Sequence, residues 1–159
     1  MRPADVEELG EGEPAEVVVE NALRKARAVG GDLVLGVDTA VVCEGVVYGK
    51  APDEAAARAY LSRLSGREHE VWSGIALRDA GGGERTAAAR TLVRFRELDE
   101  RWIDWYLGTG EWRDRAGAYA IQGLGAALVE RIDGDFWNVV GLPVAELVRL
   151  APELVLGRR

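Results

Sequence analysis

The sequence predicts an α/β protein with one domain, because helical and strand-like segments follow one another along the chain. Residues 15–29 place apolar side chains on one helical face, and residues 33–37 form a continuous apolar run of strand length. The chain has 159 residues, of which 48% are hydrophobic. This length suits a single domain with a substantial core, and we expect that domain to span residues 1–159.

The first third of the chain predicts a helix, a strand and a hairpin. Pro14 suits the first helical position, and the glycines at 30–31 stop the helix. The run at residues 33–37 is typical of a buried strand covered on both faces, and we expect it to end at Asp38. Glu44-Gly45 then reads as the turn of a hairpin between residues 40–43 and 46–48.

The rest of the chain predicts capped helices separated by strands. Aspartates at the expected helix starts can accept backbone N–H groups, and glycines mark the helix ends. In order, the expected elements are a helix from Asp53 to Gly66, strands at 70–78 and 86–96, a helix from Asp99 to Gly108, a strand at 127–132 and a helix from Pro143 to Leu150.

The charge of the chain bears on its partners. The formal net charge is −7, from 27 acidic against 20 basic residues. This excess argues against a nucleic-acid binder, which needs a basic face. No apolar run reaches the about 18 residues of a membrane helix, and the polar, acidic N-terminus does not read as a signal peptide. We therefore expect a cytoplasmic protein without a membrane or nucleic-acid partner.

The single cysteine and the single histidine have simple interpretations. Cys43 follows Val41-Val42 in an apolar run, which favours a buried small side chain. His69 lies between Glu68 and Glu70, which favours a histidine on the surface.

Asp38 is the first candidate for chemistry. An aspartate at the end of a buried apolar strand is costly to hide. In open α/β sheets, ligands bind beyond the carboxyl ends of strands. Asp38 therefore fits a general base or a metal ligand. The alternative is a turn-forming aspartate bound to its own backbone.

Three further side chains have both a functional and a structural interpretation. Lys50, between Gly49 and a proline-fixed turn, is placed to meet phosphate oxygens or is a solvated turn lysine. Gln122 follows small residues and glycines, which allow a backbone to approach a ligand. Its amide can read a base edge or bind the main chain. Lys25, considered alone, is typical of a solvated helix lysine.

Six segments carry recognisable motifs in a fixed order. Residues 36–42 resemble an "ADTVV" element, and 48–53 a "GKP-x-D" turn with one extra alanine. The remaining segments are 61–71 (LSRLSGREHEV), 73–74 (SG, where Thr-Gly is usual), 115–123 (RAGAYAIQG) and 138–143 (NVVGLP). Together they resemble the Maf family of nucleoside triphosphate pyrophosphatases.

The resemblance implies a fold and an activity. The fold is that of the Maf and inosine triphosphate pyrophosphatase type, with a curved mixed sheet, helices and two lobes around a cleft. The activity is hydrolysis of a nucleoside triphosphate to the monophosphate and pyrophosphate with a divalent metal, Mg or Mn. The Asp-Thr pair at 38–39 with Gln122 resembles the branch acting on dTTP and UTP, or on modified pyrimidine nucleotides. A homodimer is implied as well.

The resemblance also implies roles for individual residues. Asp38 matches the catalytic aspartate that activates the attacking water, and it is a metal ligand together with Glu8. Glu8 matches the acid of a "VDE" element, with Glu7 as the alternative by one register. These are the residues that match substrate-binding positions: Lys25, Thr39, Lys50 and Gln122. The two lysines would neutralise phosphate charge.

Two departures from the family pattern stand out. Arg115 replaces a lysine, which keeps the charge but not the shape. Family members also open with a strand and an "S-x-SPRR" turn that supplies arginines for the triphosphate. We expect this segment to be absent here and catalysis to be weakened; a start codon upstream of Met1 is one explanation. A non-catalytic nucleotide-binding or septation-regulating protein is therefore the alternative function.

Overall fold

The computed structural model describes residues 6–8 and 12–157, and it combines helices with a single five-stranded sheet. The elements are α1 (Pro14–Arg27), β1 (Leu33–Cys43), β2 (Val46–Tyr48), α2 (Glu54–Leu64), β3 (Glu68–Asp79), β4 (Glu84–Phe95), α3 (Glu100–Thr109), the 3₁₀ helix η1 (Leu124–Leu128), β5 (Val129–Asp133), α4 (Phe136–Val140), α5 (Val144–Leu150) and α6 (Glu153–Leu156). The predicted mixture of helices and strands is confirmed.

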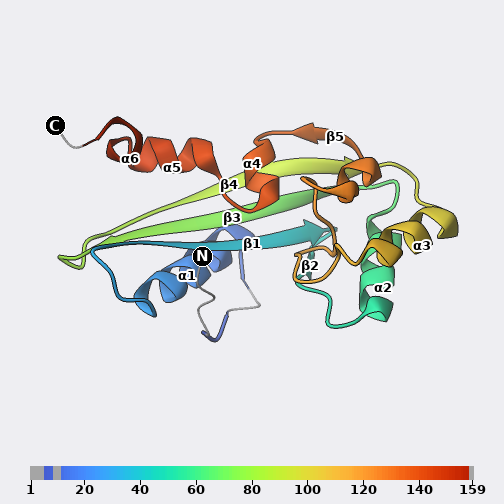
Figure 1. Ribbon diagram of the computed structural model, residues 1–159, viewed down its shortest axis with the longest axis horizontal. Helices are drawn as coiled ribbons and strands as arrows, with labels where there is room; N and C mark the ends of the chain where they lie inside the picture. The colour runs from blue at the N-terminus through green and yellow to red at the C-terminus, as the bar shows by residue number, and fades with distance from the viewer. Residues whose placement is uncertain (1–5, 9–11, 158–159) are drawn as a thin grey trace.

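The sheet has the strand order β2-β1-β3-β4-β5, and every described ladder is antiparallel. The expected parallel pairing of a mixed sheet does not occur among the described strands. Figure 1 shows α1 on one face of the sheet, α4 and α5 on the other, and α2 and α3 near one end. The largest apolar core lies at that end and includes Leu61, Phe95 and Tyr106.

Local capping explains where several helices begin and end. Asp53 accepts the N–H of Ala56 at the start of α2, and Asp99 accepts that of Trp102 at the start of α3. Gly110 closes α3 in the left-handed conformation. The caps at Asp53 and Asp99 were predicted from the sequence, whereas α4 and α6 were not.

The first strand differs from the prediction in two ways. β1 runs through Asp38 to Cys43, so the aspartate lies inside the strand rather than at its end. The strand is also not covered on both faces, because Leu33 and Leu35 are 41% and 38% exposed. The cover on the other face comes from α1. Its close approach depends on Gly36, where a Cβ would lie 2.0 Å from the carbonyl oxygen of Ala22.

Residues 6–8 belong to no helix or strand, and residues 1–5, 9–11 and 158–159 lie outside the described part of the chain. In the part of the chain that the structure describes, no helix has the length and apolarity to cross a membrane.

Candidate active site

A cavity of about 260 Å³ collects side chains from segments far apart in the sequence. Its lining comes from the acidic N-terminal segment at residues 6–8, α1, β1, the turn after β2, β3, the loop at 114–122 and the end of α4. All six residues singled out from the sequence line it: Glu8, Lys25, Asp38, Thr39, Lys50 and Gln122. The fold therefore brings the whole candidate set to one place.

The cavity wraps around the edge of β1. Successive side chains of a strand point to opposite faces, so Asp38 faces α1 whereas Thr39 faces α4. β1 pairs with β2 only from Val41 to Cys43 in the described ladders, which leaves the strand edge beside Asp38 and Thr39 open. The cavity thus has a charged side near α1 and a second side that Val37 and Val41 line.

The carboxylate of Asp38 is buried and held by two donors from α1. Its Oδ1 lies 2.6 Å from Nζ of Lys25, and its Oδ2 accepts the Asn21 amide at 3.1 Å. Only 8% of Asp38 is exposed. Both bonds come from another element, so Asp38 is not a turn-forming aspartate bound to its own backbone.

Lys25 joins two carboxylates. Its ammonium lies 2.6 Å from Oδ1 of Asp38 and 2.6 Å from Oε1 of Glu8. Burial by itself lowers the pKa of Lys25, but the hydrogen bonds to Asp38 and Glu8 outweigh it and raise the pKa above its ordinary value. Lys25 is therefore a charged member of a partly buried cluster and not a solvated helix lysine.

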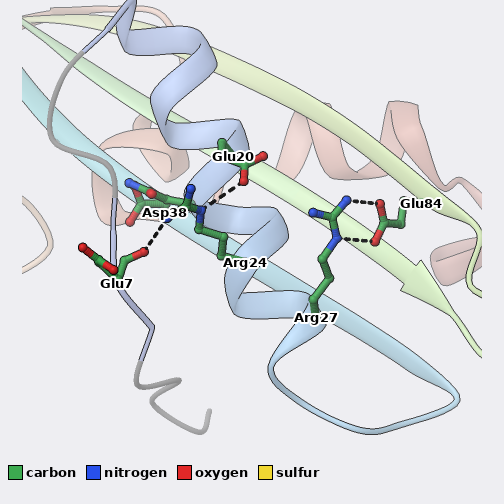
Figure 2. Close-up of polar contacts among 7 residues, drawn as sticks. Glu7, Glu20, Arg24, Arg27, Asp38 and Glu84 are labelled. Carbon is green, nitrogen blue, oxygen red and sulfur yellow. Dashed lines mark hydrogen bonds and ion pairs between the residues drawn. The ribbon is translucent and has the colours of Figure 1, made fainter.

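Two arginines of α1 hydrogen-bond to neighbouring segments, one to the acidic N-terminal segment and the other to the start of β4 (Figure 2). Arg24 donates to the carbonyl oxygen of Glu7 at 2.9 Å and to Glu20 at 3.0 Å. Arg27 forms two hydrogen bonds with Glu84, at 2.8 and 2.7 Å. The bond to the Glu7 backbone helps to keep the following residue, Glu8, beside Lys25.

Thr39 belongs to a separate hydrogen-bond network on the α4 side. Its Oγ1 lies 2.9 Å from Oγ of Ser73, the residue opposite it in the β1–β3 ladder. Ser73 donates to the carbonyl oxygen of Asn138 at 3.3 Å. Asn138 is fully buried, and its amide donates to Val71 and Thr91. The Thr39 hydroxyl is therefore fixed from the sheet and from α4.

The loop at 114–122 forms the remaining wall. Gly117 has φ +67°, and its N–H contacts the carbonyl oxygens of Tyr48 and Gly49 at 3.0 and 3.1 Å. This contact places the loop beside Lys50. Lys50 is 69% exposed and lies 3.9 Å from Asp114, so its ammonium is available at the rim. Gln122 is exposed, and its amide has no hydrogen-bond partner among the described residues.

His69 is buried, so the expectation of a surface histidine is wrong. It is 1% exposed, and its Nε2 lies 3.0 Å from the hydroxyl of Tyr119, a residue that lines the cavity. Strand alternation explains the error: Glu68 and Glu70 point outward while His69 points into the core. Burial lowers the pKa of His69 to about 4. Cys43 is buried as predicted, and burial raises the pKa of its thiol.

A divalent metal fits the donor chemistry only in part. Among the described residues, no cluster of three or more Asp, Glu, His or Cys side chains is arranged to hold a metal ion. Asp38 and Glu8 nevertheless converge on one cationic group, the ammonium of Lys25. Magnesium is commonly held by one or two carboxylates together with substrate phosphates. The two acids suit such a shared site.

Sequence reasoning missed several residues that position the candidates. Asn21 lies one turn before Lys25, and this i, i+4 spacing on a helix face was an available signal. Ser73 and Asn138 lie inside recognised motifs, but nothing local indicates that they contact Thr39. Tyr119 carried no signal for its bond to His69.

The comparisons with known proteins agree with the motifs. The family model described as Maf-like protein matches residues 1–154. The dTTP/UTP pyrophosphatase of Symbiobacterium thermophilum is 52% identical over 141 residues, covering 86% of this chain and 72% of that protein. The proteins of the same name from Anaeromyxobacter dehalogenans and Moorella thermoacetica are 50% and 51% identical, over 94% and 86% of this chain and 80% and 73% of their own lengths. The chain belongs to the family of Maf-like proteins.

Proposed function

We propose that this protein is a nucleoside triphosphate pyrophosphatase that hydrolyses dTTP and UTP, or modified pyrimidine nucleotides, to the monophosphate and pyrophosphate. The observation that carries the proposal is a cavity that joins the Asp38–Lys25–Glu8 cluster to Thr39 and Gln122. Family membership and relatives named dTTP/UTP pyrophosphatase support it.

The α4 side of the cavity suits the pyrimidine base. Val37, Val41 and Val71 line it with apolar surface, which can pack against a ring. Thr39 and Gln122 add polar groups at its margin. A few placed polar groups in an apolar pocket are the usual means of orienting a small ligand.

The charged side suits the triphosphate and the attacking water. Asp38 accepts a proton from a water molecule while the oxygen of that water attacks the α-phosphorus. The bond between the α-phosphorus and the bridging oxygen breaks, and pyrophosphate leaves with that oxygen. Asn21 and Lys25 hold the carboxylate oriented. Lys25 and Lys50 neutralise the negative charge of the phosphates, which is the main requirement of phosphoryl chemistry.

Asp38 and Glu8 would hold a divalent cation, Mg or Mn, shared with the phosphate oxygens. When bound, the cation supplies further positive charge against the triphosphate. Both carboxylates contact the Lys25 ammonium in this structure. When the cation binds, Lys25 therefore either shares the two carboxylates with it or turns toward the phosphates. We further propose a homodimer in the cytoplasm, with residues 1–159 forming one domain.

The test is a pyrophosphate-release assay on the purified chain with UTP, dTTP, ATP and GTP, in magnesium or manganese. We expect UTP and dTTP to be preferred, because a site built on specific hydrogen bonds rejects bases that leave its polar groups unpaired. Equal rates on all four nucleotides would contradict the assignment of Thr39 and Gln122. Binding of UTP without pyrophosphate release would instead favour the non-catalytic nucleotide binder.

A further inference from the structure

The hydrogen bonds around Ser73 determine which way the Thr39 hydroxyl points. Ser73 is fully buried and has one hydroxyl hydrogen. The carbonyl oxygen of Asn138, 3.3 Å away, can only accept, so the hydrogen of Ser73 is used there. Either hydroxyl can donate in the 2.9 Å contact between Thr39 and Ser73; with the Ser73 hydrogen directed at Asn138, the donor is Thr39. The hydrogen of Thr39 therefore points into the sheet, away from the cavity.

The position of the Asn138 carbonyl is itself fixed by the sheet. The Asn138 amide donates to the carbonyl oxygen of Val71 and to Oγ1 of Thr91, each at 3.0 Å. Thr91 in turn donates to the carbonyl oxygen of Asp135 at 3.1 Å and accepts the N–H of the same residue at 3.1 Å. Each carbonyl can only accept and each N–H can only donate, so the directions of the bonds that join Asn138, Thr91 and Asp135 are set.

A reversed Thr39 hydroxyl has fewer partners. If Ser73 donated to Thr39, the bond from Ser73 to the Asn138 carbonyl would be lost. A ligand N–H that approaches Thr39 keeps both internal bonds and adds a third. A ligand acceptor can bind only if Thr39 turns its hydrogen toward the ligand and Ser73 donates to Thr39 instead of Asn138. The complex then has one hydrogen bond fewer than the complex with a ligand N–H. One net hydrogen bond corresponds to roughly a fivefold to tenfold change in affinity.

We infer that Ser73 is a specificity-determining residue that makes Thr39 a hydrogen-bond acceptor toward the base and so selects the ring N3–H of uracil and thymine over the ring nitrogen acceptor of cytosine. The inference rests on the proposed function for the placement of the base beside Thr39. Ser73 does not line the cavity and acts through Thr39, so it is a positioning residue.

The test measures dissociation constants for UMP and CMP by titration calorimetry, which needs no turnover. We expect the wild-type chain to bind UMP more tightly than CMP. Ser73→Ala frees the Thr39 hydrogen to point into the cavity, so the CMP:UMP ratio of dissociation constants should fall about fivefold to tenfold. Ser73→Thr keeps a hydroxyl and should keep the ratio within about twofold. If Ser73→Ala does not fold, Ser73→Cys, with its weaker hydrogen bonds, should shift the ratio in the same direction.

A double mutant separates the proposed coupling from a general packing effect. In Thr39→Val the selective group is gone, so adding Ser73→Ala should leave the ratio unchanged. The inference is overturned if wild-type affinity for the two nucleotides is equal, if Ser73→Ala weakens both equally, or if it shifts the ratio in the Thr39→Val background. Selective UMP binding in a chain that releases no pyrophosphate from UTP would overturn the proposed activity alone.

Discussion

Gly74 lies directly opposite Asp38 in the β1–β3 ladder, and a Cβ at Gly74 would lie 2.2 Å from the carbonyl oxygen of Val18 in α1. The absence of a side chain therefore lets α1 come close enough for Asn21 and Lys25 to reach the Asp38 carboxylate.

Gly74→Ala should push α1 off the sheet. We expect it to lower the free energy of unfolding by about 1–3 kcal/mol, as overpacking does. A displacement near 1 Å should also lower pyrophosphate release about 10²-fold. Urea unfolding and the release assay measure the two effects. Gly108→Ala is the matched control, because nothing lies within 4 Å of a Cβ there, and helical alanine should be neutral or stabilising. Equal behaviour of the two variants would contradict the role of Gly74.

His69 should make the protein sensitive to acid. Burial lowers its pKa to about 4, so below pH 6.5 the unfolded chain binds a proton that the folded chain does not. Stability due to neutral His69 is thus present above pH 6.5 and is lost as the pH falls toward 4. Between pH 7 and 4.5 the loss should be on the order of 2–3 kcal/mol.

Urea unfolding of wild type and His69→Gln at both pH values measures this loss. Glutamine places a polar atom near the position of Nε2 that contacts Tyr119, and His69 is the only histidine in the chain. The difference between the two proteins should therefore shrink or reverse on acidification. Parallel losses of stability in the two proteins would show that His69 does not titrate in this range.

Glu8 should matter for the metal. Glu8→Gln removes one of the two carboxylates proposed to hold the cation, so the magnesium or manganese concentration for half-maximal activity should rise at least about tenfold. Chelation should abolish the activity of the wild type. Glu7→Gln is the matched control. Glu7 directly precedes Glu8 but is not proposed to hold the cation, so this variant should need the same metal concentration for half-maximal activity as the wild type. A shift in Glu7→Gln and none in Glu8→Gln would place the metal ligand one register earlier.

Much of the fold was predictable because its signals are local. The caps at Asp53 and Asp99 depend on residues three positions apart, and the hairpin turn needs the positive φ angles of Glu44 and Gly45. The length of β1 was not predictable in this way. Asp38 interrupts the apolar run, and only its partners on α1 make it acceptable inside a buried strand.

The candidate site was predictable as a set of residues but not as an arrangement. Motifs identified Asp38, Lys25 and Thr39, and the structure brings them to one cavity. The roles of Asn21 and Ser73 depend on contacts across 17 and 34 positions of the sequence, which no local pattern reports. The burial of His69 likewise depends on which face of β3 the core covers.

The most direct test of the proposed chemistry is the rate of pyrophosphate release from UTP by Asp38→Asn with saturating magnesium. The variant keeps the side-chain shape, and Lys25 keeps Glu8 as a partner, so the fold should survive. Asp114→Asn is the control, because that carboxylate lines the same cavity but is 90% exposed. We predict a fall of about 10²–10⁴-fold for Asp38→Asn and little change for Asp114→Asn. A folded Asp38→Asn protein that releases pyrophosphate at the wild-type rate would contradict the assignment of Asp38 as the base.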